Sequence, residues 1–240
     1  MSEHVSGTRQ REQDAWWSGA RLIVGAGVKL VFRLRCTGVE HVPEEGGALL
    51  CYNHVSVLDP IAVAVAVTAH GRIVKFMALN EDFDRPVVGW ALRRLGQIPL
   101  RRGAGDWAAI DDVSRHLKDG FLTGMSPEGK VGDGDGLLPG QKGAARVALA
   151  AQAPVVPVGV WGTQHRWPRS GVRLGPPPRP TAAVVFGPPI PAIGDPRSRL
   201  DVRTLTDSIM SGIGHAVATA RTTSAAPNGE RSSSIPGRWR

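Results

Sequence analysis

Aromatic residues and cysteine are scarce in this sequence of 240 residues. Aromatics make up only 5% of the chain, and helix-turn-helix, zinc-finger and RNP patterns are all missing, which argues against nucleic acid as a partner. The two cysteines, Cys36 and Cys51, lie in no CxxC or Cys/His cluster and are too few for a disulfide framework. Since both flank apolar, strand-like segments, they are expected to be buried, reduced thiols.

Long hydrophobic runs are also missing. The most membrane-like stretch, residues 15–35, is interrupted by arginine and lysine, and its longest uncharged piece is residues 22–28. Crossing a bilayer takes about 20 apolar residues, so this stretch cannot span one. Its two tryptophans, aliphatic residues and scattered cations predict an amphipathic helix lying on a membrane surface, with packing against the protein's own domain as the alternative. The absence of a secretory signal predicts a cytoplasmic location.

Acidic residues are fewer than basic ones in this sequence. The 29 lysines and arginines outnumber the 21 aspartates and glutamates, which gives a formal net charge of +8. Such an excess suits anionic partners, either an anionic membrane surface or phosphorylated substrates. The alternative is an arginine-rich composition with no particular partner.

Strand-like and helix-like segments alternate along the chain. Short apolar runs predict strands at residues 33–40, 48–53, 72–79, 97–102, 121–125, 154–162 and 181–187. Helices are predicted at residues 60–70, 85–96, 106–119, 141–152 and 200–221. This alternation predicts an α/β fold with a mostly parallel central sheet flanked by helices. The expected organisation is a disordered lead (1–14), an amphipathic interfacial helix (15–35), one domain (36–221) and a disordered tail (222–240).

A histidine and an aspartate five residues apart follow the expected strand at 48–53. In the stretch NHVSVLDP, His54 ends the strand, and Asp59 before Pro60 has the pattern of a helix N-cap. A turn between them returns the imidazole to the carboxylate, so that Asp59 orients His54 as a general base. A capping aspartate beside a bystander histidine is the alternative.

The group that His54 would activate is a substrate hydroxyl. A serine nucleophile is not indicated, because the sequence contains no G-x-S-x-G elbow. A metal is not indicated either, because no second histidine stands at ligand spacing. Direct deprotonation of a substrate hydroxyl is the option that is left.

Charged residues follow two further expected strands. Arg101 and Arg102 end the strand at 97–102 and form a natural fork for a phosphate, with a solvated basic corner as the alternative. The segment SPEGK, residues 126–130, follows the strand at 121–125. Because ligands bind beyond the carboxyl ends of parallel strands, these residues and His54 are expected to converge at one edge of the sheet.

Four blocks in order resemble the glycerolipid acyltransferase family, which includes the 1-acylglycerol-3-phosphate acyltransferases. The resemblance covers about residues 35–190. The matching residues are Asn53, His54, Asp59 and Pro60, then Gly96, Ile98, Pro99 and Arg102, then Pro127, Glu128 and Gly129, and finally Val156, Pro157 and Val158. Two departures stand out: Lys130 and Val131 replace the family's common Thr and Arg, and Arg101 replaces what is often an aspartate.

The resemblance implies transfer of a fatty acyl group from acyl-CoA or acyl carrier protein to the hydroxyl of a lysophosphatidic-acid-like acceptor. It implies no cofactor beyond the acyl carrier, and a peripheral position on the cytoplasmic face of the cell membrane. His54 is the implied general base, oriented by Asp59. The implied substrate-binding residues are Arg101 and Arg102 for the acceptor's phosphate, Glu128 and Gly129 for the acceptor pocket, and Lys130 as a point cation.

Two other readings stay open. The first is the same chemistry on another acceptor, such as glycerol 3-phosphate, a different lysolipid or a glycolipid, because the arginine expected at position 131 is missing. The second is a catalytically silent lipid- or acyl-carrier-binding protein that keeps the fold.

Overall fold

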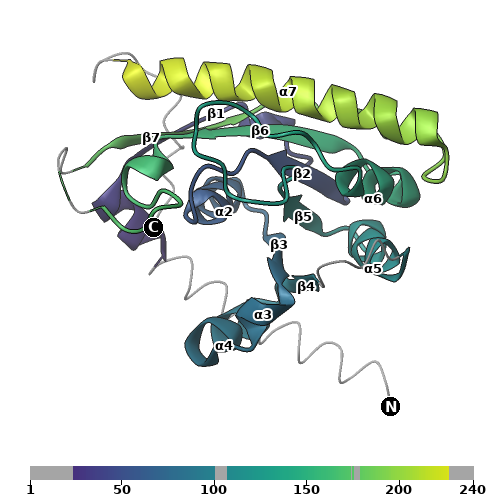
Figure 1. Cartoon of the computed structure of the whole chain (residues 1–240), viewed down its shortest axis with the longest axis horizontal. Helices are drawn as coiled ribbons and strands as arrows, with labels where there is room; N and C mark the ends of the chain where they lie inside the picture. Colours follow the sequence, from purple (N-terminus) through teal and green to yellow (C-terminus); the bar gives the residue numbers. More distant parts are fainter. Residues whose placement is uncertain (1–23, 101–106, 174, 176–178, 227–240) are drawn as a thin grey trace.

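The computed structural model describes residues 24–100, 107–173, 175 and 179–226 (Figure 1). Its centre is a seven-stranded sheet with the strand order β1-β7-β6-β2-β5-β3-β4. The strands are β1 (Arg33–Thr37), β2 (Ala48–Tyr52), β3 (Val74–Leu79), β4 (Ile98–Leu100), β5 (Leu122–Met125), β6 (Val155–Trp161) and β7 (Thr181–Phe186). Among these neighbours only β6 and β7 pair antiparallel. The predicted mostly parallel sheet is therefore confirmed.

Helices cover both faces of the sheet. Besides the helical residues 24–31, the described helices are α2 (Asp59–Ala69), α3 (Asn80–Phe83), α4 (Pro86–Arg94), α5 (Trp107–Lys118), α6 (Gly143–Ala151) and α7 (Arg199–Ala225). One core lies between α2 and the side chains of Leu50 and Tyr52, and a second lies between α5, α6, α7 and those of Leu49 and Cys51. Alternate residues of β2 thus enter opposite cores, and all five are buried, as expected of a strand covered on both faces.

The contact between α7 and β6 depends on a glycine. In Figure 1, α7 runs along β6 across the length of the sheet. A Cβ atom at Gly159, in the middle of β6, would lie 2.2 Å from the carbonyl carbon of Ala216 in α7. The absence of a side chain at Gly159 therefore lets α7 lie directly on the strand.

Three predicted boundaries differ from the structure by three residues or more. The strand expected at 33–40 ends at Thr37, because Gly38 takes a positive φ of 74° and starts a short 3-10 helix. The helix expected at 15–35 is helical at residues 24–31 but gives way to β1 at Arg33, and residues 15–23 lie outside the described residues. The final helix continues to Ala225 instead of ending at Arg221.

A long-range contact stabilises the extended end of the final helix. The Arg35 guanidinium of β1 donates a 2.6 Å hydrogen bond to the carbonyl of Thr223 in the last turn of α7. A cation at a helix C-terminus satisfies an otherwise open carbonyl and complements the helix dipole. The polar composition of this segment, which predicted a tail from residue 222, carries no sign of that contact. The expected lead (1–14) and the tail from residue 227 lie outside the described residues.

Both cysteines are buried and unpaired, as predicted. Burial raises the pKa of the Cys36 thiol to about 12. Among the residues that the structure describes, no helix is both long enough and apolar enough to cross a membrane.

Candidate active site

Asn53 fixes the point at which the chain leaves β2. Its side-chain amide donates to the carbonyl of Val160 in β6 at 3.0 Å, and its side-chain oxygen accepts from the Val160 N–H at 2.7 Å. The side chain thus extends the pairing of two parallel strands by one step and is almost fully buried. His54 follows immediately and is placed at the carboxyl edge of the sheet.

His54 and Asp59 are in direct contact. The Nδ1 atom of His54 lies 3.1 Å from Oδ2 of Asp59, and the same oxygen accepts the backbone N–H groups of Val55 and Ser56 at 2.7 Å each. The turn expected between the two residues is therefore present. The expected N-cap role of Asp59 is wrong, since α2 begins at Asp59 and Leu58 occupies the N-cap position. The carboxylate turns back onto the preceding turn because two backbone donors meet it there.

A residue far away in the chain completes the environment of Asp59. Thr163, in a 3-10 helix (Thr163–His165) after β6, donates its hydroxyl to Oδ1 of Asp59. The hydroxyl of Ser56 donates to the carbonyl of Trp167 at 2.7 Å and ties the two turns together. Sequence reasoning missed Thr163 because it lies 104 positions from Asp59, and its only signal is a polar residue just after a buried strand.

The imidazole of His54 is held in one orientation. Its Nδ1 faces the fully buried carboxylate of Asp59, and its ring meets that of Tyr52 edge-on at a centroid distance of 5.8 Å. The side chain is 20% exposed, so the ring reaches solvent while its partner does not. A neutral imidazole that donates its Nδ1 proton to Asp59 has Nε2 as a proton acceptor, which is the arrangement of a general base.

Glu128 binds the main chain at His54. Its Oε1 accepts the His54 N–H at 2.9 Å, and its Oε2 accepts the Leu138 N–H at 2.7 Å. The residue is only 4% exposed. Burial raises the pKa of Glu128 above its usual range, although the two amide hydrogen bonds and the nearby His54 act in the opposite direction.

This raised pKa predicts a pH dependence of stability. A native Glu128 holds its proton to higher pH than the same residue in the unfolded chain, where the pKa is about 4.3. The native state therefore binds more protons above that value, and the contribution of Glu128 to the free energy of unfolding falls as pH rises through the native pKa. Urea unfolding of the wild type and of Glu128→Gln, from about pH 4 upward, measures it as the difference between the two proteins. If the free energy of unfolding of the wild type minus that of Glu128→Gln rises with pH, the raised pKa of Glu128 is contradicted.

The remaining predicted residues lie in different places. Gly129 has a positive φ of 68° in the turn after Glu128, and Lys130 next to it is exposed. Arg101 and Arg102 lie outside the described residues. The structure thus brings together His54, Asp59 and Glu128, with the turn of Gly129 and Lys130 beside them.

A cavity of about 530 Å³ opens beyond the carboxyl ends of β3, β4 and β5. Gly129 and Ser126 line it on the side of the Glu128 turn, and Lys142 and Arg146 line it at the start of α6. Its apolar wall consists of Met77, Leu100, Ile110, Met125 and Val147, among others. Its size and its mixture of apolar wall and few polar groups are typical of ligand pockets.

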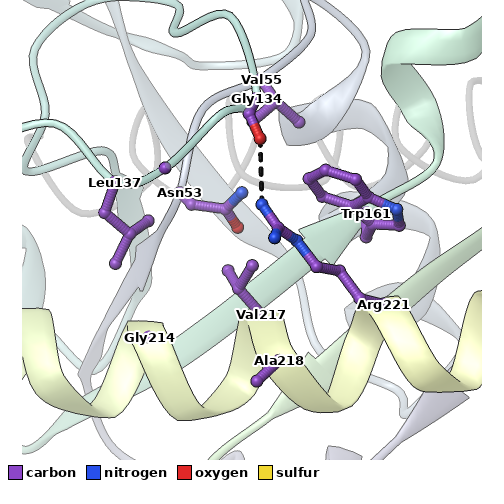
Figure 2. Close-up of a pocket in the computed structure, with 10 residues that line it drawn as sticks. Asn53, Val55, Gly134, Leu137, Trp161, Gly214, Val217, Ala218 and Arg221 are labelled. Atoms are coloured by element: carbon purple, nitrogen blue, oxygen red, sulfur yellow. Dashed lines mark hydrogen bonds between the residues drawn. The ribbon is translucent and has the colours of Figure 1, made fainter.

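A smaller cavity of about 190 Å³ lies between β6, α7 and the loop that follows Glu128 (Figure 2). Asn53 and Val55 line it, so it lies next to the main chain on both sides of His54. Its other lining residues come from the loop, from β6 and from one face of α7.

Comparison with other proteins shows relatives along part of the chain. An uncharacterized protein of Mycobacterium tuberculosis is 34% identical in an alignment of 150 positions that covers 57% of this chain and 39% of that protein. The 1-acyl-sn-glycerol-3-phosphate acyltransferase of Bacillus subtilis is 27% identical over 135 residues, 56% of this chain and 63% of the enzyme. The chain thus spans less than two thirds of the length of either relative.

The fold has a solved counterpart. The crystal structure of the 1-acyl-sn-glycerophosphate (LPA) acyltransferase of Thermotoga maritima superimposes with a TM-score of 0.70 over 92% of this chain and 84% of that one, at 19% identity. A family model described as Acyltransferase matches residues 33–161, more than half of the chain. This range contains β1 to β6, His54, Asp59 and Glu128. The chain belongs to the acyltransferase family.

Proposed function

We propose that this protein transfers a fatty acyl group from an acyl thioester, acyl-CoA or acyl carrier protein, to the hydroxyl of a lysophosphatidic-acid-like acceptor and so forms phosphatidic acid. The observation that carries the proposal is the 3.1 Å contact between Nδ1 of the partly exposed His54 and the buried Asp59. The relatives named 1-acyl-sn-glycerol-3-phosphate acyltransferase support the choice of acceptor.

In the proposed reaction, Nε2 of His54 takes the proton of the acceptor hydroxyl. The oxygen attacks the thioester carbonyl, a new carbon–oxygen ester bond forms and the carbon–sulfur bond breaks. The proton then passes from His54 to the leaving thiolate, so that the products are the ester and a free thiol. Asp59 stabilises the imidazolium in between, because its buried carboxylate faces Nδ1.

The larger cavity is the proposed site of the acyl chain. Its apolar wall lies at the ends of β3, β4 and β5, next to the turn that carries Glu128 and Gly129. Transfer of an apolar chain from water into such a cavity is favourable, and the free energy falls roughly in proportion to the apolar area that is buried.

Cations near the cavity are the proposed partners of phosphate. Lys142 and Arg146 line the cavity itself, and Lys130 is exposed on the turn beside it. Arg101 and Arg102 stay proposed ligands of the acceptor's phosphate, since they directly follow the last residue of β4. Lysine at position 130 provides a point charge instead of the bidentate fork of an arginine.

A lipid acceptor also requires contact with a membrane, and α4 presents a surface suited to it. Val87 is 79% exposed and Trp90 is 49% exposed on this helix, and Arg93 and Arg94 lie in its last turn. Exposed aliphatic and tryptophan side chains beside arginines are typical of helices at the surface of an anionic membrane. These features support peripheral contact with a membrane, and the cytoplasmic face is the proposed side.

Release of free thiol tests the proposal. Purified protein is incubated with acyl-CoA or acyl carrier protein donors of several chain lengths, each with and without lysophosphatidic acid. The expected result is release that requires the acceptor. Release that requires glycerol 3-phosphate, another lysolipid or a glycolipid would move the proposal to that acceptor. No release with any pair, together with binding of donor or lipid, would contradict transfer and favour a binding protein.

A further inference from the structure

The loop between β5 and α6, residues 126–142, runs along one face of α7. A methyl group added at Gly140 would lie 2.6 Å from Cγ of Met210, and one added at Gly214 would lie 3.7 Å from Leu137. Further along α7, Arg221 meets the loop at Gly134. Positions 210, 214 and 221 share one face of α7, and the loop contacts this face along its length.

The middle of this loop has little packing beneath it. The cavity of about 190 Å³ lies between the loop and α7, and Gly134, Gly136 and Leu137 line its loop side (Figure 2). Glycines contribute no side chains that fill the space, and they leave the backbone with the greatest conformational freedom. Leu137 packs against the core, whereas residues 134–136 depend on specific contacts instead of on burial.

Arg221 supplies such a contact from α7. Its guanidinium donates a 2.9 Å hydrogen bond to the carbonyl of Gly134, and its Cζ lies 4.1 Å from the centre of the Trp161 ring (Figure 2). Trp161 ends β6, so the guanidinium is stacked on a fixed surface. The end of α7 is itself fixed, because Arg35 donates to the carbonyl of Thr223.

Both ends of the same loop segment bind the candidate active site. The Gly132 N–H donates to the carbonyl of His54 at 2.7 Å, and the Leu138 N–H donates to Glu128, whose other oxygen accepts the His54 N–H. The main chain of His54 is thus held on both sides by groups that depend on residues 132–138. Arg221 holds the centre of that segment.

We propose that Arg221 is a positioning residue for the reaction. It fixes residues 132–138 over the small cavity, and the loop in turn keeps the His54 main chain and the Glu128 carboxylate in their working arrangement. Arg221 acts through the loop and does not touch the substrate. The kinetic part of this inference rests on the proposed acyl transfer, whereas the structural part does not.

The test compares Arg221→Ala and Arg221→Lys with the wild type and with Arg203→Ala. Arg203 is a control on the same helix, with a 79% exposed side chain 3.8 Å from Asp207. Hydrogen–deuterium exchange of peptides covering residues 130–139 reports the loop, and kcat and KM for donor and acceptor report the reaction. Loss of one hydrogen bond and one exposed cation–π contact corresponds to about a tenfold change in an opening equilibrium.

For Arg221→Ala we expect exchange in that peptide to rise about tenfold. We expect kcat to fall several-fold, because the loosened loop displaces His54 and Glu128 from their working arrangement, with KM values within about twofold of the wild type. Arg221→Lys, which keeps the cation and a donor, is expected to recover most of both, and Arg203→Ala to match the wild type. Unchanged exchange, or faster exchange with an unchanged kcat, would overturn the positioning role. So would a loss of kcat that Arg221→Lys does not reduce.

The readouts separate the two proposals. If the wild type shows no turnover with any donor and acceptor, the proposed function fails. The exchange experiment then still decides the contact: faster exchange in Arg221→Ala, reversed in Arg221→Lys, supports the fixing of the loop, and unchanged exchange overturns it.

Discussion

Replacement of His54 by alanine is expected to lower kcat for acyl transfer by about 10² to 10⁴, the range that a positioned general base contributes. The physical reason is that Nε2 of His54 is the proposed acceptor of the hydroxyl proton, and alanine offers no substitute. The side chain is partly exposed, and its main-chain hydrogen bonds to Glu128 and Gly132 do not involve the ring. Stability is therefore expected to change little.

The measurement is kcat with saturating donor and acceptor, beside thermal unfolding of each protein. His215→Ala is the matched control, because His215 is an exposed histidine of α7. In the described part of the chain, its ring forms a hydrogen bond with the carbonyl of Ser211 in the same helix. A His54→Ala variant within about threefold of the wild type would exclude His54 as the base.

Replacement of Asp59 by asparagine is expected to lower kcat by at least about 100-fold while the protein stays folded. Asparagine keeps one oxygen that can face His54, Val55 and Ser56, and its amide can donate to the hydroxyl of Thr163. It removes the negative charge that stabilises the imidazolium. The loss is therefore expected in kcat, not in the free energy of unfolding.

Replacement of Asp59 by alanine separates the two roles of the carboxylate. This variant leaves the buried N–H groups of Val55 and Ser56 without an acceptor, at a cost of about 1–3 kcal/mol for each buried group. Urea unfolding is expected to show that loss in Asp59→Ala and much less of it in Asp59→Asn. Equal destabilisation in both variants, or an unchanged kcat in Asp59→Asn, would contradict the assigned roles.

The fold and the pairing of His54 with Asp59 were accessible from the sequence because both depend on local patterns. The alternation of apolar runs and helical spacings specifies an α/β sheet, and a strand end followed by a turn needs only the stretch NHVSVLDP. The N-cap role expected of Asp59 was wrong, because the Asp-Pro pattern leaves the partner of the carboxylate open. An Asp-Pro pair indicates a helix start, but it does not tell whether the carboxylate caps the helix or accepts the amides of the preceding turn.

The contacts that sequence reasoning missed are long-range. Thr163 reaches Asp59 across 104 positions, and Arg35 reaches the end of α7 across 188. Neither partner carries a motif, since a threonine after a strand or an arginine on an edge strand is common in any protein. The main-chain role of Glu128 was missed for a similar reason: a buried carboxylate that accepts two amides has the same sequence signal as one that faces a ligand.

Formation of phosphatidic acid is the measurement that tests the central claim most directly. Wild type and His54→Ala are each incubated with an acyl thioester and lysophosphatidic acid, and the lipid product is identified by mass spectrometry beside the free thiol. We expect phosphatidic acid and thiol in equal amounts from the wild type, and background levels of both from the variant. Thiol release without the ester, or equal product from both proteins, would contradict acyl transfer by His54.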